Sequence, residues 1–487
     1  MNTIINKNRG RSKWVATLLG AQLMASFAHA GLSEEQVQAL IQRVNELEQK
    51  VKILERNKEV KDEIDTEKSK TQPTVSIGEG GLQVRSGDSN FVMNVHGYAQ
   101  SDGRFYFGHK APGTSDNFLL RRVRPIIEGT VWRDYNYRVM LDLPSGSYGS
   151  NSSNNVAILD DAYVNAHFWN EAQFQIGKYK SPLGLERLKS TAELSFIETG
   201  YATQLTPNYD VGAMVHNDVF TSRLGYAAGI FTGAADGASQ DTGLGSGKDV
   251  VGRIFLQPFL NESNSVLQHF GCGVGGSYGT HTGSALPKFT SIGQQALFSY
   301  STNLTSAGPQ YRVDPQVYYY YGPFGLNAEY ILSAQKFANA AAGLPPNVRF
   351  KNAAWQLEGS YFLTGEENSF RYTSSQHLDP IRRFGVLDGT GWGALELLAR
   401  IQQMNLDNKI FDADTLSGGT LKTPYGSSTS VTDQATSWGL GLNWYLNPNI
   451  KLSLDYENTT FRQRFAVPGS VGYKPEHALF TQAQFSF

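Results

Sequence analysis

The chain ends in the stretch Leu-Phe-Thr-Gln-Ala-Gln-Phe-Ser-Phe, residues 479–487. Leu479, Thr481, Ala483, Phe485 and Phe487 fall on one face of this stretch, because successive side chains of a β-strand point to opposite sides. Alternation with a period of two predicts a strand between two different environments. The stretch therefore predicts a terminal β-strand.

The same alternation recurs upstream, from about residue 80 onwards. It is found in residues 91–104, 135–143, 324–335, 353–364, 393–402, 438–444 and 450–458. Aromatic residues at the ends of the apolar faces are typical of the two girdles of a membrane barrel: Trp132, Tyr135, Trp169, Trp438, Trp444, Tyr445 and Tyr456. A soluble sandwich also alternates, but its polar face meets bulk water. We predict an all-β protein, a transmembrane antiparallel barrel, because a sheet in hydrocarbon must close to pair its backbone.

Turns and loops indicate the size of this barrel. Residues 321–324 and 445–450 are tight turns, whereas 144–155, 233–248, 279–294, 337–349 and 412–434 are long polar stretches expected to face outward from the cell. Roughly 25 residues per strand and its connection give about 16 strands. A barrel of that size leaves an aqueous channel. Phe485 and Phe487 are the expected signal for barrel insertion.

The N-terminus has the layout of a cleaved secretory signal over residues 1–30. Four basic residues precede an apolar stretch from Trp14 to Phe27, and Ala28-His29-Ala30 supplies small residues at the cleavage site. The alternative is a retained membrane anchor. No later apolar run reaches the roughly 18 residues of a spanning helix. Together with the barrel, this predicts location in a bacterial outer membrane.

Residues 31–57 predict a periplasmic coiled-coil helix. Ser33 and Gln36 form a capping-box start, and apolar residues follow at heptad positions a and d: Val37, Leu40, Val44, Leu47, Val51 and Leu54. Such a stripe favours identical partner helices. The alternative is a helix lying on the barrel's own periplasmic end, and the heptads leave dimer or trimer open. Residues 58–79 are almost wholly polar and predict a linker to the barrel at 80–487.

Charge and motifs exclude several classes of protein. Residues 31–487 hold 38 basic and 44 acidic side chains, which gives no support to nucleic-acid binding. The single Cys272 excludes an internal disulfide. No catalytic, metal or cofactor motif is present, so neither an enzyme nor a cofactor is expected. We predict a diffusion pore; the alternatives are a structural or adhesive barrel tethered through its coiled coil and, behind it, an outer-membrane enzyme.

Several segments resemble the phosphate-selective porin O and P family. They include Phe-Leu-Leu-Arg-Arg-Val-Arg-Pro-Ile-Ile-Glu-Gly at 118–129, Leu-Asp-Asp-Ala-Tyr-Val at 159–164, Gln-Ile-Gly-Lys-Tyr-Lys-Ser-Pro-Leu-Gly-Leu-Glu-Arg-Leu at 175–188 and Gly-Leu-Asn-Trp-Tyr-Leu-Asn-Pro at 441–448. The resemblance implies a trimeric 16-stranded barrel in outer-membrane lipid and lipopolysaccharide, which passes small anions or other small hydrophilic solutes. It also implies an inward loop as the constriction, which falls near 181–209 here.

Basic residues near that loop are the candidate selectivity groups. Period two directs Arg122, Arg124 and Arg138 to the lumen if Val123, Pro125 and Ile127 face lipid. Further candidates bracket the loop: Lys178, Lys180, Arg187 and Lys189. Period two places Lys178 and Lys180 on the apolar side, so we expect the strand to end before them.

An alternative gives the arginines a structural role. They pair across strands with acidic partners and brace the wall: Glu128, Asp142 and Asp161. Phosphate-specific members of the family have a dense ladder of arginines and lysines, whereas residues 211–260 of this chain carry only Arg223, Lys248 and Arg253. We therefore expect a weakly anion-selective general pore.

Overall fold

The computed structural model describes residues 33–108, 115–143, 158–242, 247–262, 265–284, 286–371, 377–385, 391–412, 414–417, 420–427, 432–463 and 474–487. The expected signal peptide at 1–30 and the polar loop at 144–155 lie outside the described residues. The chain divides into two compact units, Met1–Gln72 and Pro73–Phe487.

Helix α2, Glu34–Thr71, is the described element of the first unit. Its first turn carries the expected cap, with the Ser33 N–H donating to Gln36 Oε1 at 3.3 Å. The helix continues through residues 58–71, where the sequence predicted a linker, and strand β1, Thr74–Gly78, follows closely. Lysine and glutamate are strong helix formers, and pairs such as Arg56–Glu59 at 3.2 Å lie one turn apart, so a polar composition did not end the helix here. No helix among the described residues is long and apolar enough to cross a membrane.

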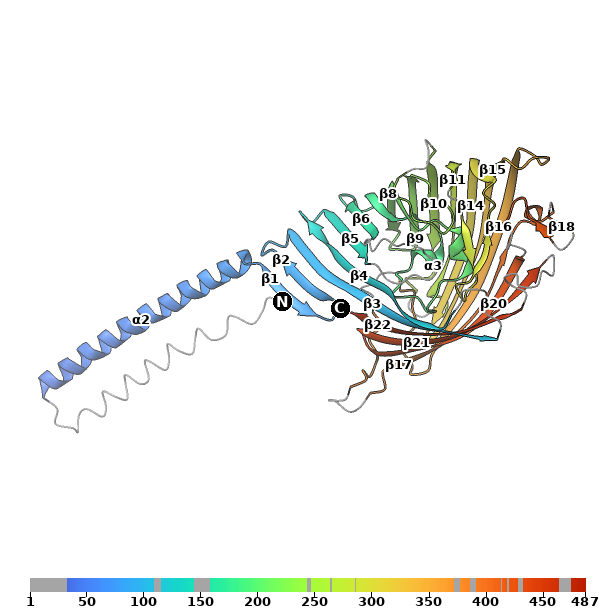
Figure 1. Ribbon diagram of the computed structural model, residues 1–487. Helices are drawn as coiled ribbons and strands as arrows, with labels where there is room; N and C mark the ends of the chain where they lie inside the picture. The colour runs from blue at the N-terminus through green and yellow to red at the C-terminus, as the bar shows by residue number, and fades with distance from the viewer. Residues whose placement is uncertain are drawn as a thin grey trace. The chain divides into compact units, whose positions relative to one another are not determined.

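Sixteen strands of the second unit form a closed antiparallel ring (Figure 1). They are β3 (Phe91–Gly108), β4 (Asn117–Val131), β5 (Tyr135–Asp142), β6 (Ile158–Ala166), β7 (Gln173–Lys180), β8 (Tyr209–Val219), β9 (Leu224–Phe231), β10 (Asp249–Leu256), β11 (His269–Gly283), β14 (Leu304–Tyr321), β15 (Phe324–Asn339), β16 (Asn347–Phe362), β17 (Ala394–Asn405), β20 (Thr432–Asn447), β21 (Ile450–Gln463) and β22 (Glu476–Ser486). Each strand pairs with the next, and β22 pairs with β3. The predicted 16-stranded barrel is confirmed.

The ring closes where the chain ends. Phe487 and Gly97 exchange two backbone hydrogen bonds of 2.9 Å. A side chain at position 97 would meet the Arg124 carbonyl oxygen at 2.5 Å, so glycine permits the close approach of the strands there. Beyond Phe487, β2 (Gly81–Arg85) pairs with the remaining length of β3, and β1 pairs with β2 in a hairpin.

The alternation predicted from the sequence sets which face each side chain occupies. In β16, Trp355, Leu357 and Tyr361 lie on the outer face, while Gln356 and Glu358 are buried inside the ring. The same holds for β15, β17 and β22. The barrel is therefore apolar outside and polar inside.

Tyr445 corrects one detail of the predicted aromatic girdles. Its neighbour Trp444 lies on the outer face, so period two turns Tyr445 inward, where its hydroxyl donates to Glu396 Oε2 at 2.8 Å. Trp132, Trp169 and Trp438 remain well exposed on the outer surface.

The two ends of the barrel differ. Tight turns such as Gly322–Pro323 and Pro448–Asn449 lie at the end that carries the C-terminus, which we call the turn end; the opposite end is the loop end. One connection at the turn end is long, because residues 363–393 join β16 to β17. At the loop end the short hairpins β12–β13 (Lys288–Thr290, Ala296–Ser299) and β18–β19 (Thr415–Ser417, Thr420–Lys422) lie between ring strands.

Residues 181–208 join β7 to β8 and are mostly buried. They contain a short helix, α3 (Leu185–Leu188), and a 3₁₀ turn, η1 (Tyr201–Leu205). An apolar core joins Tyr201 and Leu205 to Phe289, Phe298 and Phe411 from loops at the loop end. We call residues 181–208 the inward segment.

A charge placed on the outer face tests the orientation of the strands. We expect Leu440→Arg, near the middle of β20 on the outer face, to lower the free energy of unfolding by about 2–4 kcal/mol, because hydrocarbon solvates a guanidinium poorly. Denaturant unfolding of the protein inserted in lipid vesicles measures this free energy. Asn136→Arg, which places the same charge inside the ring, should cost much less. Equal losses would contradict the assigned faces.

Candidate functional site

The inward segment is attached to the far wall of the barrel by backbone hydrogen bonds. Its N–H groups donate to luminal side chains of β14, β15, β17 and β21: Gly184 to Asp314 at 2.7 Å, Leu185 to Glu329 at 2.8 Å, Tyr201 to Gln402 at 2.8 Å and Ile197 to Asp455 at 2.6 Å. Burying these groups without partners would be costly. The polar faces of those strands therefore hold the segment across the lumen.

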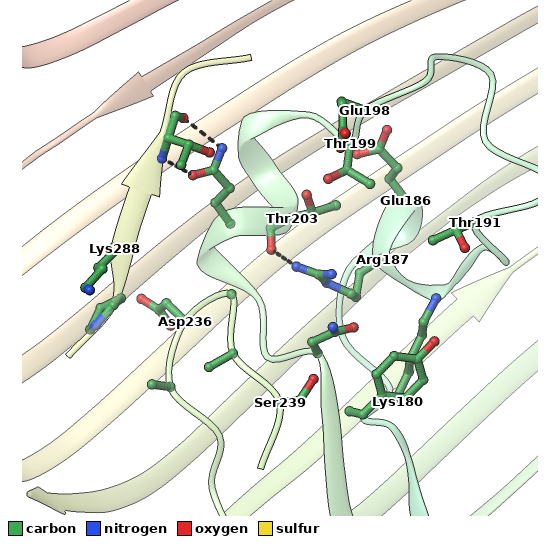
Figure 2. Close-up of a pocket in the computed structure, with 18 of the residues that line it drawn as sticks. Lys180, Glu186, Arg187, Thr191, Glu198, Thr199, Thr203, Asp236, Ser239 and Lys288 are labelled. Atoms are coloured by element: carbon green, nitrogen blue, oxygen red, sulfur yellow. Dashed lines mark hydrogen bonds between the residues drawn. The ribbon is translucent and has the colours of Figure 1, made fainter. Parts of the chain in front are cut away.

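The described residues enclose two cavities of several hundred Å³ inside the ring. The loop-side cavity encloses about 620 Å³ and has seven basic residues in its lining: Arg121, Arg122, Arg124, Lys180, Arg187, Lys189 and Lys288. Its acidic lining residues are Glu186, Glu198 and Asp236, so positive charge exceeds negative by four. Figure 2 shows Lys180, Thr191 and Arg187 on one side of this cavity and Lys288 and Asp236 on the other.

The turn-side cavity encloses about 730 Å³ and is closer to neutral. Arg138, Lys180 and Arg253 in its lining face Asp161 and Asp218. Amide and aromatic side chains make up much of the rest, from Asn136, Asn165, Gln173, Gln175, Tyr163, Tyr226 and Phe255.

Three residues line both cavities: Lys180, Thr191 and Tyr209. We call them the eyelet. Lys180 Nζ lies 5.6 Å from the centre of the Tyr209 ring and donates to the Lys189 carbonyl oxygen at 2.7 Å. Arg124 donates to Thr191 Oγ1 at 3.1 Å behind them. A solute that passes from one cavity to the other meets this cationic group.

Two β-bulges direct extra charges inward. Arg121 is the unpaired residue where the register between β3 and β4 shifts, and Asp160 is its counterpart between β5 and β6. A regular strand would turn Arg121 and Arg122 to opposite faces, whereas a bulge re-aims one of the two side chains. Both members of Arg121–Arg122 line the loop-side cavity.

Glu198 of the inward segment is the centre of a buried arginine cluster. Its carboxylate lies 2.6 Å from Arg104, 2.9 Å from Arg121 and 4.0 Å from Arg122. Burial alone would raise the pKa of Glu198, but the three guanidinium groups outweigh it and hold the pKa at about 2. The carboxylate therefore ties the inward segment to β3 and β4 and leaves an excess of positive charge.

Arg124 and Arg138 are neutralised by the wall. Arg124 contacts Asp142 at 2.7 Å and Asp160 at 2.8 Å. Arg138 contacts Asp161 at 3.0 Å and also pairs with Glu128. Both side chains lie inside the ring and line a cavity, but acidic side chains in cross-strand pairs neutralise their charges.

The basic residues around the inward segment differ from these arginines. Among the described residues, no carboxylate lies within 4.0 Å of the charged atoms of Lys180, Arg187 or Lys189. Arg187 donates to Thr206 Oγ1 at 3.1 Å and to the Thr203 carbonyl oxygen, and burial lowers its pKa. Lys189 lies 5.0 Å from the centre of the Phe370 ring. Their charge is available to a solute.

Lys178 lies elsewhere. Strand β7 continues to Lys180 instead of ending before Lys178, which corrects that expectation. Lys178 is not among the lining residues of the two cavities; it donates to the Leu159 carbonyl oxygen at 2.6 Å and pairs with Asp241. Lys180, the last residue of the strand, reaches both cavities.

Sequence reasoning did not select Arg104, Arg121, Asp160, Glu198 or Lys288. Consecutive like charges within an alternating segment, as in Arg121-Arg122 and Asp160-Asp161, are the signal that was available for two of them. Glu198 and Lys288 stand in connections, where no periodicity predicts a direction.

A closed barrel of this size, with polar cavities on both sides of a cationic eyelet, is the architecture of a diffusion porin. The chain belongs to the phosphate-selective porin O and P family, whose model matches residues 93–487. It is 25% identical to Porin O of Pseudomonas aeruginosa over 413 residues, which is 77% of this chain and 85% of that protein. The protein is therefore an outer-membrane channel.

Solved structures agree on the fold. The outer membrane channel DcaP of Acinetobacter baumannii aligns with a TM-score of 0.50 and 11% identity, over 83% of this chain and 99% of that one. Membership of a porin family points to a channel and not to an enzyme.

Loss of the Glu198 carboxylate tests the arginine cluster. We expect Glu198→Gln to destabilise the folded barrel by about 3–5 kcal/mol, because buried guanidinium groups lose their partner. Since its pKa falls from 4.5 to about 2 on folding, the stabilisation is present above pH 4.5 and is lost as the pH falls through 2. Denaturant unfolding of both proteins from pH 7 to 2 measures this.

The exposed Asp379–Arg383 pair supplies the control, because Asp379→Asn should change little. A stability difference between wild type and Glu198→Gln that persisted unchanged at pH 2 would contradict the role assigned to the carboxylate.

Proposed function

We propose that this porin is a weakly anion-selective general channel for small hydrophilic solutes. The observation that carries the proposal is the group of cations at the eyelet and loop-side cavity without a carboxylate partner among the described residues: Lys180, Arg187 and Lys189. Basic side chains around a pore attract anions and repel cations. Arg122, whose nearest carboxylate is 4.0 Å away, adds to them.

Family membership alone does not make phosphate the specific solute of this chain. Holding phosphate needs several convergent donors. On β8–β10 the described lining offers Arg253, which donates to Gln316 Oε1 at 3.1 Å. We infer that the barrel passes anions as a class, with phosphate among them.

Lys180 and Lys178 offer a matched test of selectivity. In planar bilayers with a KCl gradient, we expect a reversal potential biased towards chloride, and Lys180→Gln should weaken the bias because it removes an unpaired charge from the eyelet. Lys178→Gln removes the same charge two residues away and outside both cavities, so it should leave the potential unchanged.

Equal effects of the two substitutions would contradict the assigned roles. A preference for potassium in wild type would reject anion selectivity. Planar bilayers that show no conductance after insertion of the protein would favour a structural barrel.

We also propose that α2 joins identical copies into an oligomer, with the trimer of other porins as the expected number. The heptad residues Leu40, Val44, Leu47, Val51 and Leu54 are 47–66% exposed. An isolated helix with such a stripe is only marginally stable in water, and a coiled coil buries it.

Two neighbouring residues test the coiled coil. Leu54 occupies a d position and Ile53 lies off the seam, although both are exposed in the single chain. We expect Leu54→Ser, in the full-length protein, to lower the melting temperature of the helical circular-dichroism signal and to reduce its dependence on protein concentration. Ile53→Ser should change neither. A helix lying on its own barrel would melt independently of concentration in all three proteins.

A further inference from the structure

The turn-side cavity carries a row of neutral hydrogen-bonding side chains on four adjacent strands. Asn136 of β5 stands opposite Asn165 of β6, which stands opposite Gln175 of β7; Gln173 of β7 stands opposite His216 of β8. All five line the cavity. We call these five residues the polar belt.

Part of the polar belt is satisfied within the wall. Asn165 Nδ2 donates to Gln173 Oε1 at 2.7 Å, and His216 Nε2 lies 3.1 Å from Asn165 Oδ1. These bonds fix the directions of the three side chains. The belt is therefore a preorganised surface.

Two amide side chains of the polar belt take no part in these hydrogen bonds. Among the described residues, the side chains of Asn136 and Gln175 make no hydrogen bond, and Gln175 is only 8% exposed. A nearly buried amide without a partner is costly unless water or a solute bonds to it. Both amides face a cavity of about 730 Å³, a volume typical of small-molecule sites.

The chemistry of the two compartments differs in a way that matches one class of solute. Lys180 in the eyelet offers a positive charge to both cavities, whereas the belt beyond it offers amide N–H and C=O groups. Neutral amides attract ions weakly, but they match hydroxyl groups, which donate and accept. Inorganic phosphate carries the negative charge but lacks the set of sugar hydroxyl groups that would bond with the belt.

We propose that the preferred solutes are compact organic anions that carry several hydroxyl groups, such as phosphorylated or carboxylated sugars. The acidic group binds at Lys180, and the hydroxyl groups bond with the polar belt in the turn-side cavity. This inference rests on the proposed anion selectivity and names the class of solute within it.

Aromatic residues also line the turn-side cavity, and three of them form a stacked column. Tyr318 stacks between Phe255 and Phe370 with ring centres 5.1 Å apart on each side. Arg253 lies 4.6 Å from the centre of the Phe255 ring, and Lys189 lies on Phe370. The ring faces of this column are therefore covered by one another and by two cations.

Block of chloride current through the full-length protein tests the proposal, with glucose 6-phosphate, inorganic phosphate, glucose and benzoate as probes. In wild type, we expect glucose 6-phosphate to block at a concentration about tenfold below that of phosphate, since two added hydrogen bonds have about that effect. In Asn136→Leu/Gln175→Leu this advantage should disappear, while block by phosphate and the chloride conductance stay unchanged. The double variant breaks no hydrogen bond among the described residues, and its chloride conductance reports folding.

Asn136→Leu alone gives a second measurement, because its side chain is half-buried and its loss leaves the cavity open. It should reduce the advantage of glucose 6-phosphate about threefold. The proposal is overturned if phosphate blocks wild type as well as glucose 6-phosphate does, if benzoate equals glucose 6-phosphate, or if both variants keep the full advantage. Lys180→Gln should weaken block by both phosphates; unchanged block there would overturn the proposed role of the eyelet while leaving the belt comparison intact.

Discussion

A sheet in hydrocarbon has no water to pair its edges, and closure of the ring between β22 and β3 is the constraint on which this structure depends. The chain meets it at its last residue, where Phe487 pairs with Gly97. Closure also fixes the parity of every strand, since a slip of one residue would turn the polar faces outward. Closure between β22 and β3 therefore determines which side chains line the lumen.

Charge inside the closed ring is used in two ways. Arg124 and Arg138 sit in cross-strand pairs with acids, so they stabilise the wall and contribute little field to the lumen. Lys180, Arg187 and Lys189 contact carbonyl oxygens, hydroxyl groups or an aromatic ring, and none of these neutralises their charge. The two hypotheses for the basic residues, bracing and selectivity, therefore divide by partner: the arginines paired with acids brace the wall, and we propose that the cations without an acidic partner give the channel its selectivity.

The sequence predicted what local periodicity determines. The strands and their outward faces followed from alternation of residues such as those in 353–364, and their number followed from the length of the barrel segment. The girdle residue Tyr445 was misplaced only because its parity with Trp444 was not applied. The bulges that turn Arg121 and Asp160 inward break that period, so alternation could not place them. Contacts such as Ile197 with Asp455 join residues far apart in the chain, and no local pattern encodes them. The length of α2 was missed because composition alone does not separate a charged helix from a linker.

The inward segment also leaves both cavities on the same side of the lumen. It bonds to luminal side chains of β14, β15, β17 and β21, and none of the described residues of β15–β17 or β20–β22 lines either cavity. The two cavities therefore lie on the side formed by β3–β10 and β14. That side holds the eyelet, the arginine cluster and the polar belt, so under the proposed function a solute passes the cations before it reaches the hydrogen-bonding surface. Because charge acts over a distance and hydrogen bonding acts only on contact, we propose that charge governs which solutes enter and hydrogen bonding governs how long they stay.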